Sequence, residues 1–294
     1  MRRHIVALLR DPRYSPHSEV KDRAIMMQTL EELSRREQSI TWKVYDERAW
    51  AALHHKAMEE QAAESVQNAF YGEADLYLSM SRDEETLKLL HRLELRGIPV
   101  INPTWGVEQC HRSVLDRLLH ANRIPLPPQR GDDGYWLKRG DGAAQTKEDV
   151  VYCRDHKALN MALAAFHERG VTDLVVSAHV KGDVVKFYGV GTRFFRYYYP
   201  TDDGISKFGD EKVNGAAHHY PFREERLMTR AQQIASLTGV QVYGGDAIVR
   251  PSGRFVFIDF NDWPSFSRCR VEAAAAIAEE VLEKGFRNNV PETV

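Results

Sequence analysis

The stretch Gly244–Pro264, GGDAIVRPSGRFVFIDFNDWP, contains two short apolar runs joined by a Pro-Ser-Gly turn. The runs Tyr243–Val249 and Phe255–Phe260 have the composition of buried strands, and the turn between them predicts a β-hairpin. Each run nevertheless contains a carboxylate, Asp246 in the first and Asp259 in the second. Because unpaired charge is costly to bury, these aspartates indicate a functional site.

Asn261 follows Asp259 at i+2, so both side chains leave the same face of an extended strand. If the hairpin brings Asp246 beside them, two carboxylates and one amide oxygen form a hard, all-oxygen site suited to Mg²⁺ or Mn²⁺. Magnesium usually completes its coordination with water and substrate phosphates. The hairpin therefore predicts a metal site. The alternative is a pair of solvated aspartates at frayed strand ends.

The pattern G-x-D, a hairpin, then D-x-N-x-x-P resembles the metal-binding end of the ATP-grasp superfamily. The resemblance covers nearly the whole chain and is closest to the branch of ribosomal-protein glutamate ligases, glutathione synthetases and ATP-grasp inositol polyphosphate kinases. It implies an α/β chain with α+β lobes, in which a Rossmann-like domain precedes the ATP-grasp fold. The implied domains are 1–103 (pre-ATP-grasp), 104–180 (central lid) and 181–294 (C-terminal, with the metal site).

Residues 4–102 support that division, because they alternate strands with helices, as in a parallel sheet covered by helices. Ligands bind beyond the carboxyl ends of such strands, where the segments 10–18 and Ser79–Arg82 are expected. In ATP-grasp proteins this domain helps to bind the non-nucleotide substrate. Arg10, Arg13, His17 and Ser18 are therefore candidates, although a solvated polar loop explains them equally well.

The resemblance also implies a set of phosphate contacts. A helix predicted from Thr104 to about Asn122 precedes the extended run Ile124-Pro-Leu-Pro-Pro. Arg112 in that helix matches a phosphate-binding lysine of relatives, although an arginine on the surface of a helix would need no such role. Lys138, at the end of the predicted strand Tyr135–Lys138, matches the family's strand lysine. Gly140 and Gly142 lie in the following loop, which would close over ATP.

The segment 173–191 resembles the family's adenine-binding hinge and the strand after it. Ala178 and Val180 would contact adenine through backbone groups, and Asp183 would contact the ribose. Lys186 would face the phosphates, or would instead be a lysine protecting an edge strand. Arg196, in an aromatic-rich strand, matches an arginine that supports the acyl-phosphate or acceptor in the ligases, so Arg196 and Lys186 are the predicted catalytic residues.

These assignments predict an enzyme that uses ATP with Mg²⁺ or Mn²⁺. The first interpretation is a carboxylate–amine ligase acting through an acyl-phosphate on a small-molecule or peptide acceptor. The second is a small-molecule kinase resembling the inositol-phosphate kinases, favoured by the glycine-poor loop after Lys138. The third is a catalytically silent ATP-binding sensor or scaffold, suggested by the altered hinge and by Arg112.

Composition limits the setting in which such an enzyme works. The 294 residues are 43% hydrophobic and 28% charged, as in a globular enzyme, and the net charge of −2 gives no reason to expect nucleic acid or an anionic membrane as partner. No apolar run approaches the roughly 20 residues of a membrane span. The three cysteines are widely spaced, which favours the cytoplasm over a disulfide framework. The sequence leaves the oligomeric state open, a homodimer included.

Overall fold

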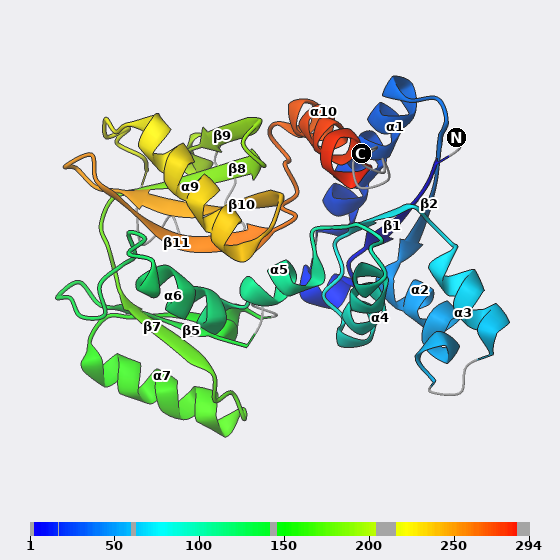
Figure 1. Ribbon diagram of the computed structural model, residues 1–294. Helices are drawn as coiled ribbons and strands as arrows, with labels where there is room; N and C mark the ends of the chain where they lie inside the picture. The colour runs from blue at the N-terminus through cyan, green and yellow to red at the C-terminus, as the bar shows by residue number, and fades with distance from the viewer. Residues whose placement is uncertain (1–2, 17, 60–62, 142–145, 204–215, 287–294) are drawn as a thin grey trace.

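A computed structural model describes residues 3–16, 18–59, 63–141, 146–203 and 216–286 of the chain. Three β-sheets follow one another along the sequence, and helices cover their faces (Figure 1). The predicted residues His17 and Gly142 lie outside the described part. None of the described helices is long and apolar enough to cross a membrane.

The first sheet is the parallel one expected from the alternating pattern. Its order is β2-β1-β3-β4, and every neighbouring pair runs parallel. Asp83 begins one of its helices by accepting a hydrogen bond from the N–H of Thr86, a standard N-cap contact. The strands are β1 (Arg3–Leu9), β2 (Ile40–Asp46), β3 (Leu76–Ser79) and β4 (Val100–Ile101), and the helices are α1 (Glu19–Arg36), α2 (Glu47–His54), α3 (Glu64–Tyr71) and α4 (Glu84–Leu95).

The second sheet is antiparallel, with the order β6-β5-β7. It contains β5 (Tyr135–Arg139), β6 (Val150–Cys153) and β7 (Leu174–Ala178), and is packed with α7 (His156–Glu168). The single helix predicted from Thr104 to Asn122 is wrong. Two helices occur instead, α5 (Thr104–Gln109) and α6 (Arg112–Ala121), because His111 has an extended backbone with φ −61° and ψ 130°. This break places Arg112 in the first turn of α6.

The third sheet is antiparallel, with the order β11-β10-β8-β9. Its strands are β8 (Asp183–Val190), β9 (Phe194–Tyr198), β10 (Val242–Val249) and β11 (Phe255–Asp262). Helix α9 (Glu224–Thr238) covers one face, where Leu227 and Ile234 pack in one apolar cluster with Phe187 and Phe257. The hairpin predicted from Tyr243 to Phe260 is confirmed as β10 and β11.

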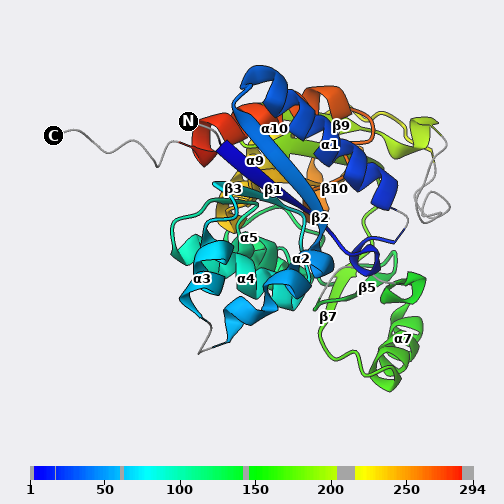
Figure 2. The same cartoon turned by 90° about the vertical axis from the view of Figure 1, so that its right-hand side faces the viewer.

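Helix α10 (Arg270–Glu280) joins the first and third sheets. It lies beside α1 in both views of the ribbon (Figure 1 and Figure 2). One apolar cluster contains Ile5 of β1, Val190 of β8 and Ile277 of α10. The C-terminal helix therefore fixes the first sheet against the third, and a site between them has two rigid walls.

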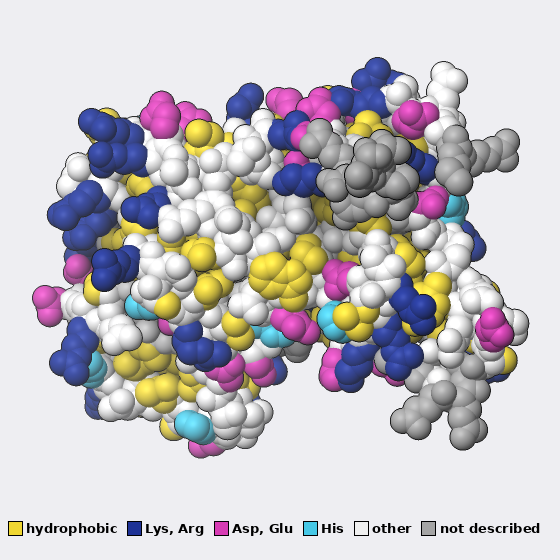
Figure 3. Space-filling view, viewed as in Figure 1, with side chains coloured by type: hydrophobic (Ala, Val, Ile, Leu, Met, Phe, Trp, Pro, Cys, Tyr) yellow, Lys and Arg dark blue, Asp and Glu magenta, His cyan; other side chains and the backbone are white. Residues whose placement is uncertain are grey.

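Acidic and basic side chains both occur on the face shown in Figure 3, in keeping with the net charge of −2. The arrangement of sheets and helices is of the predicted α/β class. The division of the chain into 1–103, 104–180 and 181–294 stays a prediction.

Candidate active site

The hairpin places its two aspartates directly opposite each other. Asp246 pairs with Asp259 in the β10–β11 register, and Asn261 pairs with Gly244 two positions along. The register shifts directly after Asp246, because Ile258 is an extra residue on β11. Such a bulge increases local twist and re-aims the neighbouring side chains. Asn261 Nδ2 donates to Asp259 Oδ2 at 2.9 Å, so the predicted convergence of these side chains on one face is present.

Lys186 extends this group into a row across three strands. It pairs with Asp246 in the β8–β10 register, and its Nζ lies 2.7 Å from Asp246 Oδ1. Burial lowers the pKa of Lys186, but the charge of Asp246 and smaller contributions from Tyr188 and Asp259 raise it overall. The alternative of an edge-strand lysine is wrong, because β8 lies between β10 and β9.

Two further cations reach the row from the central part of the chain. Lys138 Nζ donates to the carbonyl of Ile258, the bulge residue, at 2.8 Å. Arg112 Nη1 donates to the carbonyl of Arg139 at 2.6 Å. Burial raises the pKa of Asp259, but the charges of Arg112 and Lys138, the Asn261 hydrogen bond and the charge of Lys186 outweigh it and lower the pKa. Asp259 is therefore held ionised by the cations predicted to bind phosphate.

A cavity of about 170 Å³ opens beside Asp259. Its walls come from all three parts of the chain and include Tyr14, Arg82, His111, Arg112, Asp259 and Asn261. Within the described residues, no cluster of three or more His, Cys, Asp and Glu side chains has metal-binding geometry. The predicted site is of another kind, two carboxylates with one amide, and this oxygen donor set suits magnesium. The ammonium of Lys186 lies 2.7 Å from Asp246 Oδ1, so a metal held by Asp246 would share this carboxylate with Lys186.

Comparison with known proteins identifies the fold. No protein-family model and no curated protein sequence matches the chain. Solved structures do match along almost its whole length. D-alanine–D-alanine ligase from Bacillus anthracis, complexed with ATP, is 12% identical with a TM-score of 0.62, covering 97% of this chain and 98% of its own. The protein has the ATP-grasp fold.

Two other solved structures agree. VanG D-Ala:D-Ser ligase from Enterococcus faecalis is 13% identical with a TM-score of 0.64, covering 97% of this chain and 100% of its own. An ATP-grasp RimK domain protein from Sphaerobacter thermophilus is 19% identical with a TM-score of 0.59, and the match covers 95% of this chain and 99% of its own. The resemblance inferred from the hairpin motif is confirmed at the level of the fold.

The predicted adenine hinge follows β7. The N–H of Ala178 donates to the carbonyl of Pro128 at 2.7 Å, so an adenine contact from Ala178 would use its carbonyl. No described residue accepts a hydrogen bond from the N–H of Val180. Between them, the His179 side chain is fixed by Trp136, whose Nε1 donates to His179 Nδ1 at 3.0 Å. The adenine role of Ala178 and Val180 stays a prediction, through one acceptor and one donor.

The structure gives Gly140 and Asp183 other contacts than those predicted. The N–H of Gly140 donates to Asp173 at 2.7 Å, and its carbonyl accepts from Ser113 at 3.0 Å, so its backbone donor is not available to phosphate in this conformation. Asp183 is 2% exposed, and its two oxygens accept the N–H groups of His218 (2.7 Å) and Tyr220 (2.9 Å). It anchors the 218–220 segment, and a ribose contact by Asp183 is not supported by this arrangement.

Arg196 is not brought into the row among the described residues. It is exposed on β9, the outer strand of the sheet, and its Nη1 donates to the carbonyl of Phe195 at 3.0 Å. The register places it opposite Tyr188, on the same face as Lys186 but one strand outside and two positions along. Its catalytic role stays a prediction without a contact to support it.

The residue that sequence reasoning missed is Arg82. The segment Ser79–Arg82 was expected at the carboxyl edge of the first sheet, but no role was assigned to Arg82. Its Nη2 lies 2.5 Å from Asp262 Oδ1, directly after the metal motif. Its position after a parallel strand predicts a place at the ligand-binding edge of the sheet. That position singles out Arg82 only when the third sheet is known to face this edge. The other N-terminal candidates, Arg10 and Arg13, bind Asp22 and Asp11 at 3.0 Å each.

Proposed function

We propose that the protein is an ATP- and Mg²⁺-dependent ligase that joins a carboxylate to an amine on a small-molecule or peptide acceptor. The observation that carries the proposal is the row Lys186–Asp246–Asp259, which meets Lys138 and Arg112 beside an open cavity. Solved proteins of the same fold are ligases by name, among them D-alanine–D-alanine ligase and VanG D-Ala:D-Ser ligase, and this agreement supports the reaction class.

The residues of the row and their neighbours each have a part in this chemistry. Asp246, Asp259 and Asn261 would hold Mg²⁺ (or Mn²⁺), which when bound neutralises phosphate charge and fixes the phosphate geometry. Lys138, Lys186 and Arg112 bind the remaining phosphate oxygens. Phosphoryl transfer depends mainly on such positioning and charge stabilisation, so the protein needs no nucleophile of its own.

The proposed reaction has two steps. A carboxylate oxygen of the substrate forms a bond to the γ-phosphorus of ATP, the bond to the β–γ bridging oxygen breaks, and ADP and an acyl-phosphate result. The amine then forms a bond to the acyl carbon, the bond from that carbon to the phosphate oxygen breaks, and orthophosphate leaves. The nitrogen gives up a proton, and the product is an amide.

The test incubates the full chain with ATP, MgCl₂ and a panel of amino acids, dipeptides and polyols, with EDTA as control. We expect orthophosphate and ADP to form in equal amounts with a new amide, detected by mass spectrometry. A stable phosphorylated product without orthophosphate would identify a kinase. Tight ATP binding without turnover on any substrate would identify a nucleotide sensor. Either result would overturn the ligase proposal.

A further inference from the structure

The wall of the cavity facing the metal hairpin contains an arginine with unused donors. Arg82 follows β3, its side chain is 15% exposed, and it lines the cavity beside Asp259. Its Nη2 binds Asp262 Oδ1 at 2.5 Å. Across the described parts of the chain, neither Nε nor Nη1 of Arg82 has an acceptor. Neither nitrogen is among the buried side-chain atoms without a partner, so both are open to the cavity, where an anionic ligand group can accept from them.

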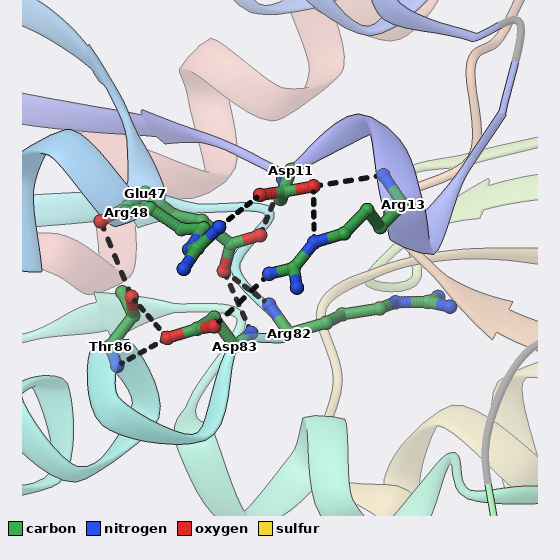
Figure 4. Close-up of polar contacts among 7 residues, drawn as sticks. All are labelled: Asp11, Arg13, Glu47, Arg48, Arg82, Asp83 and Thr86. Atoms are coloured by element: carbon green, nitrogen blue, oxygen red, sulfur yellow. Dashed lines mark hydrogen bonds and ion pairs between the residues drawn. The ribbon is translucent and has the colours of Figure 1, made fainter.

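The backbone of Arg82 is fixed by a separate carboxylate. Glu47, the first residue of α2, is fully buried and accepts the N–H groups of Arg82 and Asp83 at 2.8 Å each and that of Asp11 at 2.5 Å. In Figure 4 the Arg82 side chain extends out of this cluster, and no contact joins its guanidinium to the other residues drawn. Glu47 therefore ties together the loops after β1 and β3, while the Arg82 guanidinium reaches across to the hairpin.

The charges around this wall limit what the ligand carries. Asp262, 1% exposed, already offsets part of the charge of Arg82. Farther along the same edge, Arg13 lies 3.0 Å from Asp11, and Arg48 lies 3.8 Å from the other oxygen of Asp11. A polyphosphate needs a surplus of cations, which these paired residues do not supply. A carboxylate is a single anionic group that a guanidinium can bind through Nη1, so it fits Arg82 better than a polyphosphate does.

We infer that Arg82 binds the free carboxylate of an α-amino acid or peptide substrate, and so determines which acceptors the protein takes. The inference rests on the proposed function, and names the substrate class of that site. Lys138, Lys186 and Arg112 serve the nucleotide phosphates, whereas Arg82 comes from the N-terminal sheet and serves the other substrate. Asp262 and Glu47 act as positioning residues, because one orients the guanidinium and the other holds its backbone.

Binding is the direct test, and it uses the full chain with the non-hydrolysable analogue AMP-PNP and Mg²⁺. Calorimetry would measure the affinity for each common L- and D-amino acid, a dipeptide set and inositol hexakisphosphate, with and without nucleotide. We expect at least one amino acid or dipeptide to bind. Arg82→Gln should weaken that binding at least tenfold, and Arg82→Lys should weaken it less, while AMP-PNP affinity stays within twofold.

Two variants control for indirect effects. Arg82→Gln leaves the buried Asp262 without its counter-charge, so the double variant Arg82→Gln, Asp262→Asn removes both charges and should show the same loss of amino-acid binding in a folded protein. Arg154→Gln alters an arginine whose side chain is 85% exposed and does not line the cavity, so it should leave amino-acid binding and AMP-PNP binding unchanged.

Three results would overturn the inference. They are amino-acid binding that persists in both Arg82 variants, binding of inositol hexakisphosphate that depends on Arg82, and no binding of any amino acid or dipeptide by the wild-type chain. Failure of the proposed function looks different. In that case AMP-PNP fails to bind or ATP is not turned over, while Arg82-dependent amino-acid binding is still present.

Discussion

Replacing Asp259 with asparagine tests the metal site most directly, because it removes one charge and keeps the side-chain size. Asp259 and Asp246 lie near three cations, Lys186 of the row and Lys138 and Arg112 beside it. Removing one group that stabilises transition-state charge typically costs about 2.7–4 kcal/mol, or roughly 10²–10³ in rate. We expect Asp259→Asn to lose that much Mg²⁺-dependent ATP turnover. Three cations then face one carboxylate, so metal-free ATP should bind at least as tightly as it does to the wild type.

The assay pairs steady-state ADP formation in MgCl₂ with nucleotide titration in EDTA, and checks folding by thermal denaturation. The lowered pKa of Asp259 means that its ionised form stabilises the fold above the ordinary carboxyl pKa, and that this stabilisation is lost as pH falls through the lowered value. The variant should therefore be slightly less stable than wild type at pH 7 and should converge with it in acid. Unchanged turnover would refute the hairpin assignment. A fall in metal-free ATP affinity together with turnover would show that the site had collapsed instead of losing a ligand.

Three further predictions concern other residues. Lys186→Met should reduce ATP turnover by about 10² through loss of one charge predicted to face the phosphates, whereas Lys88→Met, which changes a 56% exposed lysine on α4, should not change it. Gly245→Ala should cost about 1–3 kcal/mol in urea denaturation, because a Cβ would collide with the Asp259 carbonyl and the Phe187 ring. Burial raises the pKa of Glu73, but His54, Trp50 and Tyr77 lower it to about 2. Glu73→Gln should therefore cost about 3 kcal/mol at pH 7, and the difference from wild type should vanish as pH falls from about 4.5 to 2.

Local patterns predicted the elements that carry their own signals. The apolar runs around Asp246 and Asp259 required a hairpin, and its register then fixed both side chains on one face. Lys186 was predicted from the family resemblance, and its position beside Asp246 became clear only from the pairing of β8 with β10. Gly140 shows that a glycine alone does not identify a phosphate contact, because its missing side chain here permits close packing on Asp173.

Longer-range features could not be predicted in the same way. The break before Arg112 depends on the extended backbone of His111. The sequence at that point contains no strong helix-breaking residue, so the break could not be predicted. Asp183 was expected at the ribose, but its environment depends on the segment His218–Tyr220, more than 30 residues away, folding back over it. Arg82 pairs with a residue 180 positions later in the chain. Such contacts follow from how the sheets pack, and single-strand periodicity does not encode that packing.

The two halves of the site therefore differ in how they are held. Lys186, Asp246 and Asp259 occupy neighbouring strands of one sheet, so backbone pairing fixes their spacing and they move together. Arg82 lies in the loop after β3 of the first sheet, and its position depends on Glu47, which binds its backbone, and on Asp262, which binds its guanidinium. A change in the N-terminal loops can thus re-aim Arg82 without disturbing the hairpin row. We therefore expect mutations to separate nucleotide chemistry from acceptor choice, because different sheets position the groups to which we assign each role.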